Sequence, residues 1–169
     1  GSRRDGGFAE YCSVPARWAM KLPENVSLEE GALAEPLANA CAVVRNCRIQ
    51  EGDRVVIIGP GPIGILAVQV ALLQQPSSVV LLGTRDSRLE IGRKAGATHV
   101  VNIHHDGAMG QLDEILGGRG ADVVMECAGV PDALEMAIEI AGRNGRVAIE
   151  GSMGNAETIT SYPRRVRVK

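Results

Sequence analysis

Three glycines that follow an apolar run are the residues of this sequence best suited to bind a phosphate. Gly59, Gly61 and Gly64 form the pattern Gly-x-Gly-x-x-Gly directly after four consecutive apolar residues. In such a turn the first glycine permits a tight bend, the second lets a pyrophosphate approach the backbone, and the third lets a helix pack closely on the strand. The sequence therefore predicts a pyrophosphate cradle, with Pro62 and Ile63 at the start of the helix.

The segment after the glycines supplies the second half of that cradle. A helix is expected over about 63–75, and its first backbone N–H groups have no partner inside the helix. These groups and the positive end of the helix dipole attract phosphate oxygens. Because a strand precedes the glycines and a helix follows them, the pattern indicates a dinucleotide site more strongly than isolated glycines would.

The end of the second strand, expected over 79–82, bears on the choice of dinucleotide. A site for NAD places Asp or Glu there, about 20 residues beyond the glycines, to bind the ribose hydroxyls. This chain has Gly83 instead, followed by Thr84 and Arg85. Without a carboxylate, a hydroxyl and a guanidinium can bind a 2′-phosphate, and Arg88 can add a second cation. We therefore favour NADP over NAD.

The alternative is that Arg85 is a solvated loop residue and that Asp86 binds the ribose. Asp86 lies three residues beyond the expected position, where its reach would be poor. It also stands next to Ser87, which forms with Glu90 a capping-box pattern at the start of a helix. We therefore interpret Asp86 as part of the helix start. Arg88 is equally consistent with an exposed helix face.

Small residues follow the fourth and fifth expected strands, over 122–126 and 145–149. At the carboxyl ends of parallel strands they would leave room for the adenine, ribose and nicotinamide groups. Close packing also favours small residues at such places, so each is weak evidence by itself. The candidate residues are Ala128, Gly129, Gly151 and Ser152.

The alternation of short apolar runs with helix-length segments predicts the fold. It indicates an α/β fold with a doubly wound parallel sheet of the Rossmann type and ligand binding at the carboxyl ends of its strands. The expected strands are 54–58, 79–82, 99–102, 122–126 and 145–149, and the helices are 63–75, 87–95, 109–116 and 132–141.

The first fifty residues differ in pattern from the rest. A strand is expected over 8–14, a capping box between Ser27 and Glu30, and a helix over about 37–48 that follows Pro36. We therefore predict two parts, 1–50 and a dinucleotide-binding domain over 51–169.

Composition narrows the class of protein. The chain has 169 residues, 45% of them hydrophobic, and a net charge of −2, which gives no reason to expect nucleic acid or a membrane as a partner. The cysteines stand at positions 12, 41, 47 and 127, without the spacing of a zinc knuckle or a disulfide framework. Reduced, mostly buried thiols in a cytoplasmic protein are expected. No apolar run reaches the ~20 residues of a membrane span, and no signal peptide is apparent.

Taken together, these segments resemble the zinc-dependent medium-chain alcohol and polyol dehydrogenases. The glycine motif in the form Gly-Pro-Gly-Pro-Ile-Gly is similar to that of the zinc-containing branch. The run Glu35-Pro36-Leu37 is similar to the sorbitol and threonine dehydrogenase subgroups. Further matching segments are Gly7-Phe8-Ala9-Glu10-Tyr11, Leu22-Pro23, 31–34, Gly52-Asp53-Arg54-Val55, Arg88-Leu89, Gly96-Ala97 and Glu126-Cys127-Ala128-Gly129.

The resemblance implies hydride transfer between a nicotinamide cofactor and a small alcohol or polyol, with zinc bound at a site to which Glu35 belongs. It also implies that this chain corresponds to about half of such an enzyme. The zinc-binding cysteine, the Gly-His-Glu motif and the sixth strand of the family are not found in the sequence. We therefore expect residues 1–50 to be a remnant of the catalytic domain, and the chain alone to hold no zinc and to be inactive. Family members commonly pair through the sixth strand, so a homo-oligomer is possible.

Two other functions remain open at this point. A stand-alone, non-catalytic dinucleotide-binding module would explain the missing zinc ligands, although it leaves the Glu35 segment without a use. A methyltransferase-like doubly wound fold is less favoured, because such sites lack the glycine cradle at a helix end. A cysteine and a Gly-His-Glu segment encoded upstream would select the dehydrogenase.

Overall fold

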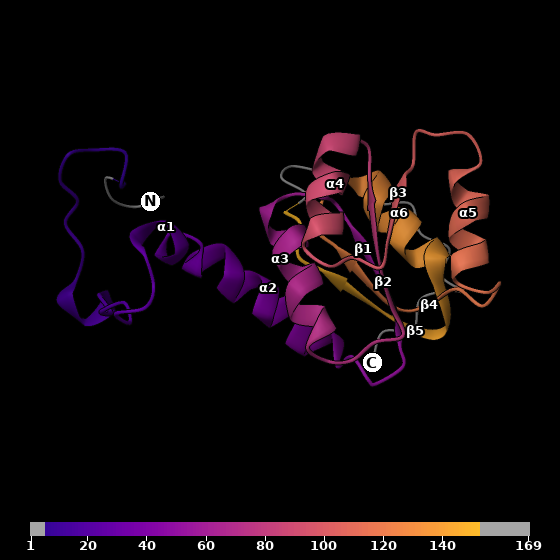
Figure 1. Cartoon of the computed structure of the whole chain (residues 1–169), viewed down its shortest axis with the longest axis horizontal. Coiled ribbons are helices and arrows are strands. Elements are labelled where there is room, and N and C mark those ends of the chain that lie inside the picture. Colours follow the sequence, from indigo (N-terminus) through magenta and orange to yellow (C-terminus); the bar gives the residue numbers. More distant parts are fainter. Residues whose placement is uncertain (1–5, 153–169) are drawn as a thin grey trace. The chain divides into compact units, whose positions relative to one another are not determined.

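The computed structural model of the chain describes residues 6–152 (Figure 1). The chain divides into two units between Ala34 and Glu35, and each is considered by itself. The boundary lies near the start of helix α2 (Ala34–Cys47), so most of this helix belongs to the second unit. Among the described residues, no helix is both long enough and apolar enough to cross a membrane.

The first unit contains only short helices in its described part. These are a 3-10 turn, η1 (Ala16–Trp18), and one turn of α-helix, α1 (Leu28–Gly31). The expected capping box at α1 is confirmed: the Glu30 amide donates to Ser27 Oγ (3.2 Å), and the Ser27 amide donates to Glu30 Oε2 (2.8 Å). The strand expected over 8–14 is wrong. Residues 8–10 form bends and residues 11–14 have no regular structure, and no described strand pairs with this segment to supply hydrogen bonds.

In its described part, the second unit is built on a sheet of five parallel strands in the order β3-β2-β1-β4-β5, as expected for the doubly wound class (Figure 1). β1 is the central strand, because it pairs with β2 on one side and with β4 on the other. Its four residues 55–58 are buried, as a strand covered on both faces requires. The strands are β1 (Arg54–Ile58), β2 (Ser78–Gly83), β3 (His99–Asn102), β4 (Ala121–Glu126) and β5 (Ala141–Ile149).

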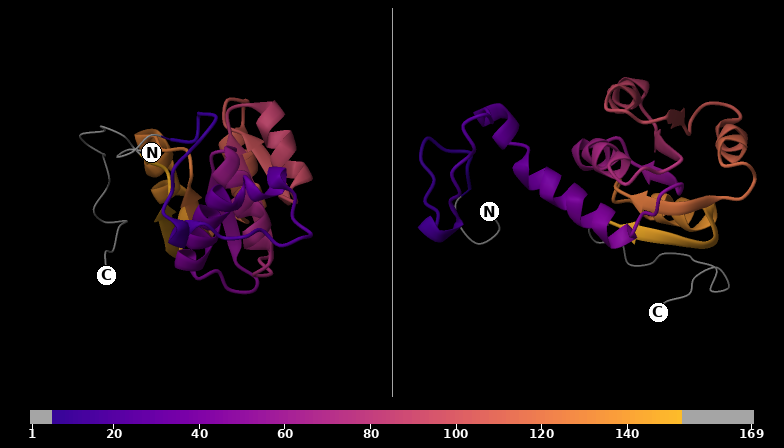
Figure 2. Two further views of the ribbon diagram at one scale, coloured as in Figure 1. Left: turned by 90° about the vertical axis from the view of Figure 1, so that its left-hand side faces the viewer. Right: turned by 60° about the horizontal axis from the view of Figure 1, so that its bottom comes forward.

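Helices cover both faces of the sheet, and alternate strand residues face the two layers (Figure 2). Val55 and Ile57 pack with α2, α3 and α4, whereas Val56 and Ile58 pack with α5 and α6. The core is therefore aliphatic on both sides. The remaining helices are α3 (Pro62–Leu72), α4 (Asp86–Lys94), α5 (Ala108–Ile115) and α6 (Pro131–Ile140).

β5 begins earlier than the sequence indicates. Ala141 pairs with Ala121, and the next paired residue is Arg146 opposite Val123, so the intervening residues form an irregularity in the ladder. Asn144 has φ of 63° there, a left-handed conformation that Asn tolerates. The regular part of the strand corresponds to the predicted 145–149.

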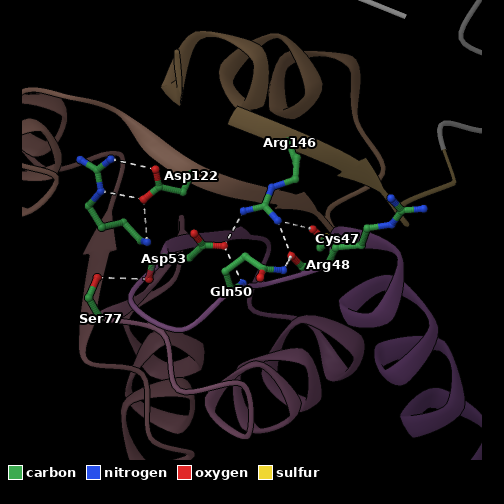
Figure 3. Close-up of polar contacts among 8 residues, drawn as sticks. Cys47, Arg48, Gln50, Asp53, Ser77, Asp122 and Arg146 are labelled. Atoms are coloured by element: carbon green, nitrogen blue, oxygen red, sulfur yellow. Dashed lines mark hydrogen bonds and ion pairs between the residues drawn. The ribbon is translucent and has the colours of Figure 1, made fainter. Parts of the chain in front are cut away.

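An ion-pair network joins β1, β4, β5 and the end of α2 at the amino edge of the sheet (Figure 3). Arg54 donates Nε to Asp122 Oδ2 (2.8 Å) and Nη2 to Oδ1 (3.0 Å), a bidentate pair that lowers the pKa of Asp122. Arg146 pairs with Asp53 and donates Nη1 to the carbonyl of Cys47 (3.1 Å), which caps α2. Ion pairs therefore join the strands at the amino edge of the sheet, whereas the glycines of the predicted cradle lie at the carboxyl edge.

Candidate dinucleotide site

Gly59 ends β1 in a conformation that only glycine adopts without strain. Its φ is 108°, and a Cβ at this position would lie 2.8 Å from the amide nitrogen of Ala128. The turn after β1 therefore packs backbone against backbone on the loop after β4. The amide of Gly59 continues the ladder by donating to the carbonyl of Leu82 (2.9 Å).

Gly64 and Gly61 have different surroundings. A Cβ on Gly64 would lie 2.0 Å from the carbonyl oxygen of Gly59, so this glycine lets α3 pack directly on the end of β1. A Cβ on Gly61 would meet nothing within 4 Å. Gly61 is the N-cap of α3, and its backbone is extended, with φ of −83° and ψ of 178°. It leaves open space beside the first turn of the helix.

Gly83 lies buried at the end of β2, next to Pro60 of the glycine turn. A Cβ on Gly83 would lie 2.5 Å from Cγ and 2.6 Å from Cδ of the proline. The ring therefore occupies the space that a side chain at position 83 would enter. The missing carboxylate has a structural reason here: an Asp or Glu would require Pro60 to move.

The turn after β2 exposes the residues that we assigned to a 2′-phosphate. Thr84, Arg85 and Arg88 are all exposed, and neither arginine side chain has an ion pair in the part of the chain that the structure describes. Asp86 is engaged elsewhere: it accepts a hydrogen bond from Asn102 Nδ2 (2.7 Å) and lies 3.5 Å from His105 Nε2. This geometry supports the view that Asp86 does not take the place of a ribose-binding acid.

The prediction of a capping box formed by Ser87 and Glu90 is wrong. α4 begins at Asp86, its N-cap is Arg85, and no side chain caps it. Glu90 accepts instead from Arg93 Nε (2.7 Å), a partner on the next turn of the helix. A charged partner at i+3 competes for this carboxylate, and Asp86 in the first turn contributes only its charge.

The loops after β4 and β5 meet through their backbones. Gly129 has φ of 74°, and a Cβ there would lie 2.7 Å from the carbonyl oxygen of Ser152. A Cβ on Gly151 would lie 2.2 Å from the amide nitrogen of Gly129. The small residues expected in these loops are therefore required by close packing between the loops. Ala128 and Ser152 are exposed at the surface of this edge.

Sequence inspection did not single out Glu126, the last residue of β4. Its side chain is fully buried, although it carries a carboxylate. The only indication in the sequence is one acidic residue at the end of an apolar strand and before small residues. Next to it, burial raises the pKa of the Cys127 thiol to about 12, with further increases from the charges of Glu126 and Glu150. Cys127 is therefore a neutral thiol at ordinary pH.

Glu35 is exposed in the first turn of α2, where it accepts a hydrogen bond from Asn39 Nδ2 (3.1 Å). Within residues 6–152, no group of three or more His, Cys, Asp or Glu side chains could hold a metal ion. A catalytic zinc site uses three protein ligands. The described residues therefore do not fit zinc. Two of the cysteines, Cys12 and Cys41, are exposed, which corrects the expectation of mostly buried thiols.

A cavity of about 390 Å³ lies beside β3, apart from the glycine turn. None of the glycines of the cradle lines it, and its walls come from α4, β3, the segment between β3 and α5, and α5 itself. It includes the Asp86 and His105 side chains described above. Its walls combine apolar side chains, such as Leu89 and Val100, with polar ones, and none of the residues predicted to bind a phosphate lines it.

Comparison with known proteins places these features in a family. Residues 62–167 match the family described as zinc-binding dehydrogenases. Sorbitol dehydrogenase from Bacillus subtilis is 33% identical over 159 residues, covering 94% of this chain and 45% of that protein. D-xylulose reductase from Saccharomyces cerevisiae is 36% identical over 157 residues, covering 90% and 44%. The chain thus spans less than half the length of these relatives.

Solved structures agree with this assignment. A zinc-binding dehydrogenase from Sinorhizobium meliloti 1021 bound to NADP has a TM-score of 0.86 and 34% identity, covering 96% of this chain and 48% of that one. A short chain alcohol dehydrogenase from Escherichia coli CFT073 complexed with NADH has a TM-score of 0.85 and 29% identity, covering 95% and 47%. Because the family match extends over more than half of its length, the chain belongs to the zinc-binding dehydrogenase family.

Proposed function

We propose that this chain is the dinucleotide-binding part of a zinc-dependent alcohol or polyol dehydrogenase and that it prefers NADP to NAD. The observation that carries the proposal is the open space at Gly61 beside the start of α3. When bound, the nicotinamide ring exchanges a hydride with the substrate alcohol. The residues described here bind the dinucleotide and orient it for that exchange.

The first turn of α3 is suited to hold the pyrophosphate. Ile65 donates its amide to the carbonyl of Gly61 (2.9 Å), so the amides of Ile63 and Gly64 precede this bond and lack helical partners. They lie at the positive end of the helix dipole. Gly61 leaves the space through which phosphate oxygens would reach them.

The preference for NADP rests on the end of β2. Gly83 has no carboxylate to repel a 2′-phosphate, and Pro60 fills the space that one would need. Arg85 and Arg88 are exposed on the turn and the first part of α4, where guanidinium groups can donate to phosphate oxygens. One related structure contains NADP and another NADH, so the family fold accommodates both and this chain's own residues must decide.

The remaining features of the whole enzyme are proposed from the family. In such an enzyme Glu35 would belong to the zinc site, but the described residues supply no further ligands, so we expect elemental analysis of the purified chain to find no stoichiometric zinc. Small alcohols or polyols are the proposed substrates, and a cytoplasmic location is proposed. Self-association is proposed through the side of β5 that faces away from β4, where no other strand pairs with it among residues 6–152. A stand-alone dinucleotide-binding module is the alternative.

Titration calorimetry with NADPH and NADH tests the proposed function. The chain should bind NADPH more tightly, and Arg85→Ala should weaken NADPH binding only. The loss of one charge-assisted phosphate contact corresponds to ~1.5–3 kcal/mol, or a Kd about 10–150 times higher. Arg143→Ala is the matched control, since Arg143 is exposed at the irregular start of β5, the opposite end of that strand from Gly151. Equal affinities for the two cofactors would refute the preference, and binding of neither would refute the function.

A further inference from the structure

Glu126 is the one charged residue, among those that the structure describes, whose side chain is fully buried. It ends β4 at the carboxyl edge of the sheet, next to the loops that carry the candidate cofactor residues. Burying an ionised carboxylate is costly unless hydrogen bonds compensate for the lost water. Its position therefore requires an explanation beyond the packing of an apolar strand.

One oxygen of this carboxylate holds the loop after β4. Oε1 accepts hydrogen bonds from the amides of Ala128 (2.7 Å) and Gly129 (2.7 Å). Both bonds are short and charge-assisted, which makes them stronger than bonds between neutral groups. These bonds show that both amides point back toward the end of β4, and the positive φ of Gly129 redirects the chain after it. The side chain of Glu126 thus fixes the course of the two residues that follow Cys127.

The other oxygen faces the segment after β5. Oε2 is buried and has no hydrogen-bond partner within the described part of the chain. A Cβ on Gly151 would lie 2.5 Å from it, so the carboxylate lies directly against the backbone at that residue. The main chain of Glu126 contacts the same segment, because its carbonyl accepts from the amides of Glu150 (2.8 Å) and Gly151 (3.1 Å).

These contacts connect Glu126 to the glycine cradle through a stack of backbones. The loop that Oε1 holds packs on Gly59 on one side, through Ala128, and on Ser152 on the other, through Gly129. No side chain separates these turns: a Cβ would fall within 3 Å of the neighbouring backbone at Gly59, Gly129 and Gly151. A shift of the β4 loop would therefore be passed on to the turn that precedes α3.

We propose that Glu126 is a positioning residue for the dinucleotide site, and this proposal rests on the proposed function. Its carboxylate holds the loops after β1, β4 and β5 at a fixed spacing through backbone contacts, and it does not itself contact the cofactor. The unpartnered Oε2 favours this role over a purely stabilising one. A group retained only for stability would have no reason to leave a buried carboxylate oxygen unpaired.

Two substitutions separate the hydrogen bonds from the charge. Glu126→Gln keeps an oxygen that can accept from both amides but removes the charge that strengthens the bonds. Charged and neutral bonds differ by about 1 kcal/mol, so NADPH should bind up to about fivefold more weakly to this variant. Glu126→Ala leaves both amides unpaired and should weaken binding further. Glu139→Gln is the matched control, because it removes the same charge from an exposed position of α6.

The experiment measures three quantities for the full chain and each variant at a temperature well below its unfolding midpoint. These are the Kd for NADPH, the amide hydrogen exchange of Ala128 and Gly129, and the midpoint itself. The proposal expects affinity to fall in the order wild type, Gln, Ala, with faster exchange at both amides and no change in the control. A loss of affinity measured while each variant is still fully folded is the result that a structural role alone would not produce.

The outcomes that overturn the proposal are distinct from those that overturn the proposed function. If wild type binds NADPH and both variants bind it equally well, the positioning role fails, whatever happens to the unfolding midpoint. If wild type binds neither NADPH nor NADH, the proposed function fails, and the positioning role with it. If Glu126→Ala does not fold, Glu126→Gln decides by itself.

Discussion

Gly61→Ala separates cofactor binding from folding more cleanly than any other change in the cradle. The added methyl meets nothing within 4 Å, and the backbone of Gly61, with φ of −83° and ψ of 178°, is open to alanine. Replacing glycine at a compatible position stabilises the fold by about 0.4–1 kcal/mol through the unfolded chain. Alanine is a poorer N-cap than glycine by a similar amount. The two effects nearly cancel, so the unfolding midpoint should scarcely change.

Dinucleotide binding should respond very differently. The methyl occupies space beside the amides of Ile63 and Gly64, where the proposed pyrophosphate would lie. Displacing the phosphate from even one of these charge-assisted bonds costs ~1.5–3 kcal/mol, which raises Kd about 10–150-fold. NADPH and NADH should be affected alike, because both carry the pyrophosphate.

The assay is calorimetric titration of both cofactors together with thermal unfolding followed by circular dichroism. Gly110→Ala is the matched control. It is an exposed glycine within α5 where an added Cβ also meets nothing within 4 Å. It should raise stability by roughly 0.5–1 kcal/mol and leave cofactor affinity unchanged. Unchanged affinity in a folded Gly61→Ala variant would refute the placement of the pyrophosphate.

Two further predictions concern stability. Gly64→Ala should destabilise the fold by at least ~1–3 kcal/mol in denaturant unfolding, because its Cβ would lie 2.0 Å from a backbone oxygen that cannot rotate away; a wild-type midpoint would contradict this packing. For Cys127, burial raises the pKa from 9.0 to about 12, so the folded state keeps a proton that the unfolded state loses, and stability should fall between about pH 9 and 12. Urea titrations at several pH values should show a smaller loss of stability for Cys127→Ala than for the wild type. The part of the loss due to Cys47, whose pKa burial raises to about 11, should remain. An unchanged dependence of stability on pH would count against the burial of the Cys127 thiol.

The central elements of the fold could be predicted from the sequence because their evidence is local. The strands 54–58 and 99–102 have the predicted bounds, since apolar runs there are bounded by residues that favour turns. The capping box of Ser27 and Glu30 also depends only on residues three positions apart. Patterns within one turn or one strand contain most of the information that determines such elements.

The failures arose where a partner distant in sequence, or a competing neighbour, decides the outcome. Residues 8–14 have the composition of a strand, but a strand needs a partner, and the described sheet provides none. Ser87 and Glu90 have the spacing of a capping box, but Arg93 pairs with the carboxylate instead. In both cases the local pattern was present, but in the first no described strand completes the ladder and in the second a competing partner takes the carboxylate.

In the candidate site, too, local features could be predicted from the sequence and contacts between distant residues could not. The glycine positions follow from their spacing, whereas the contact of Gly83 with Pro60 joins residues on two different strand ends. Glu126 could not be recognised as a connection between loops, because its partners become neighbours only when β1, β4 and β5 lie side by side (Figure 1). The assignment of a 2′-phosphate to Arg85 and Arg88 stays a prediction.

The most direct test of the central claim is a titration of the ¹⁵N-labelled chain with NADP⁺, followed by the chemical shifts of its amides. Binding at the glycine cradle predicts saturable shifts at Gly61, Ile63 and Gly64, and none at Ser77 on the opposite edge, where its amide donates to the Asp53 carbonyl (2.8 Å). If the three amides stay unmoved while NADP⁺ is added, or if the shifts gather at the amino edge of the sheet, the dinucleotide does not bind where we place it.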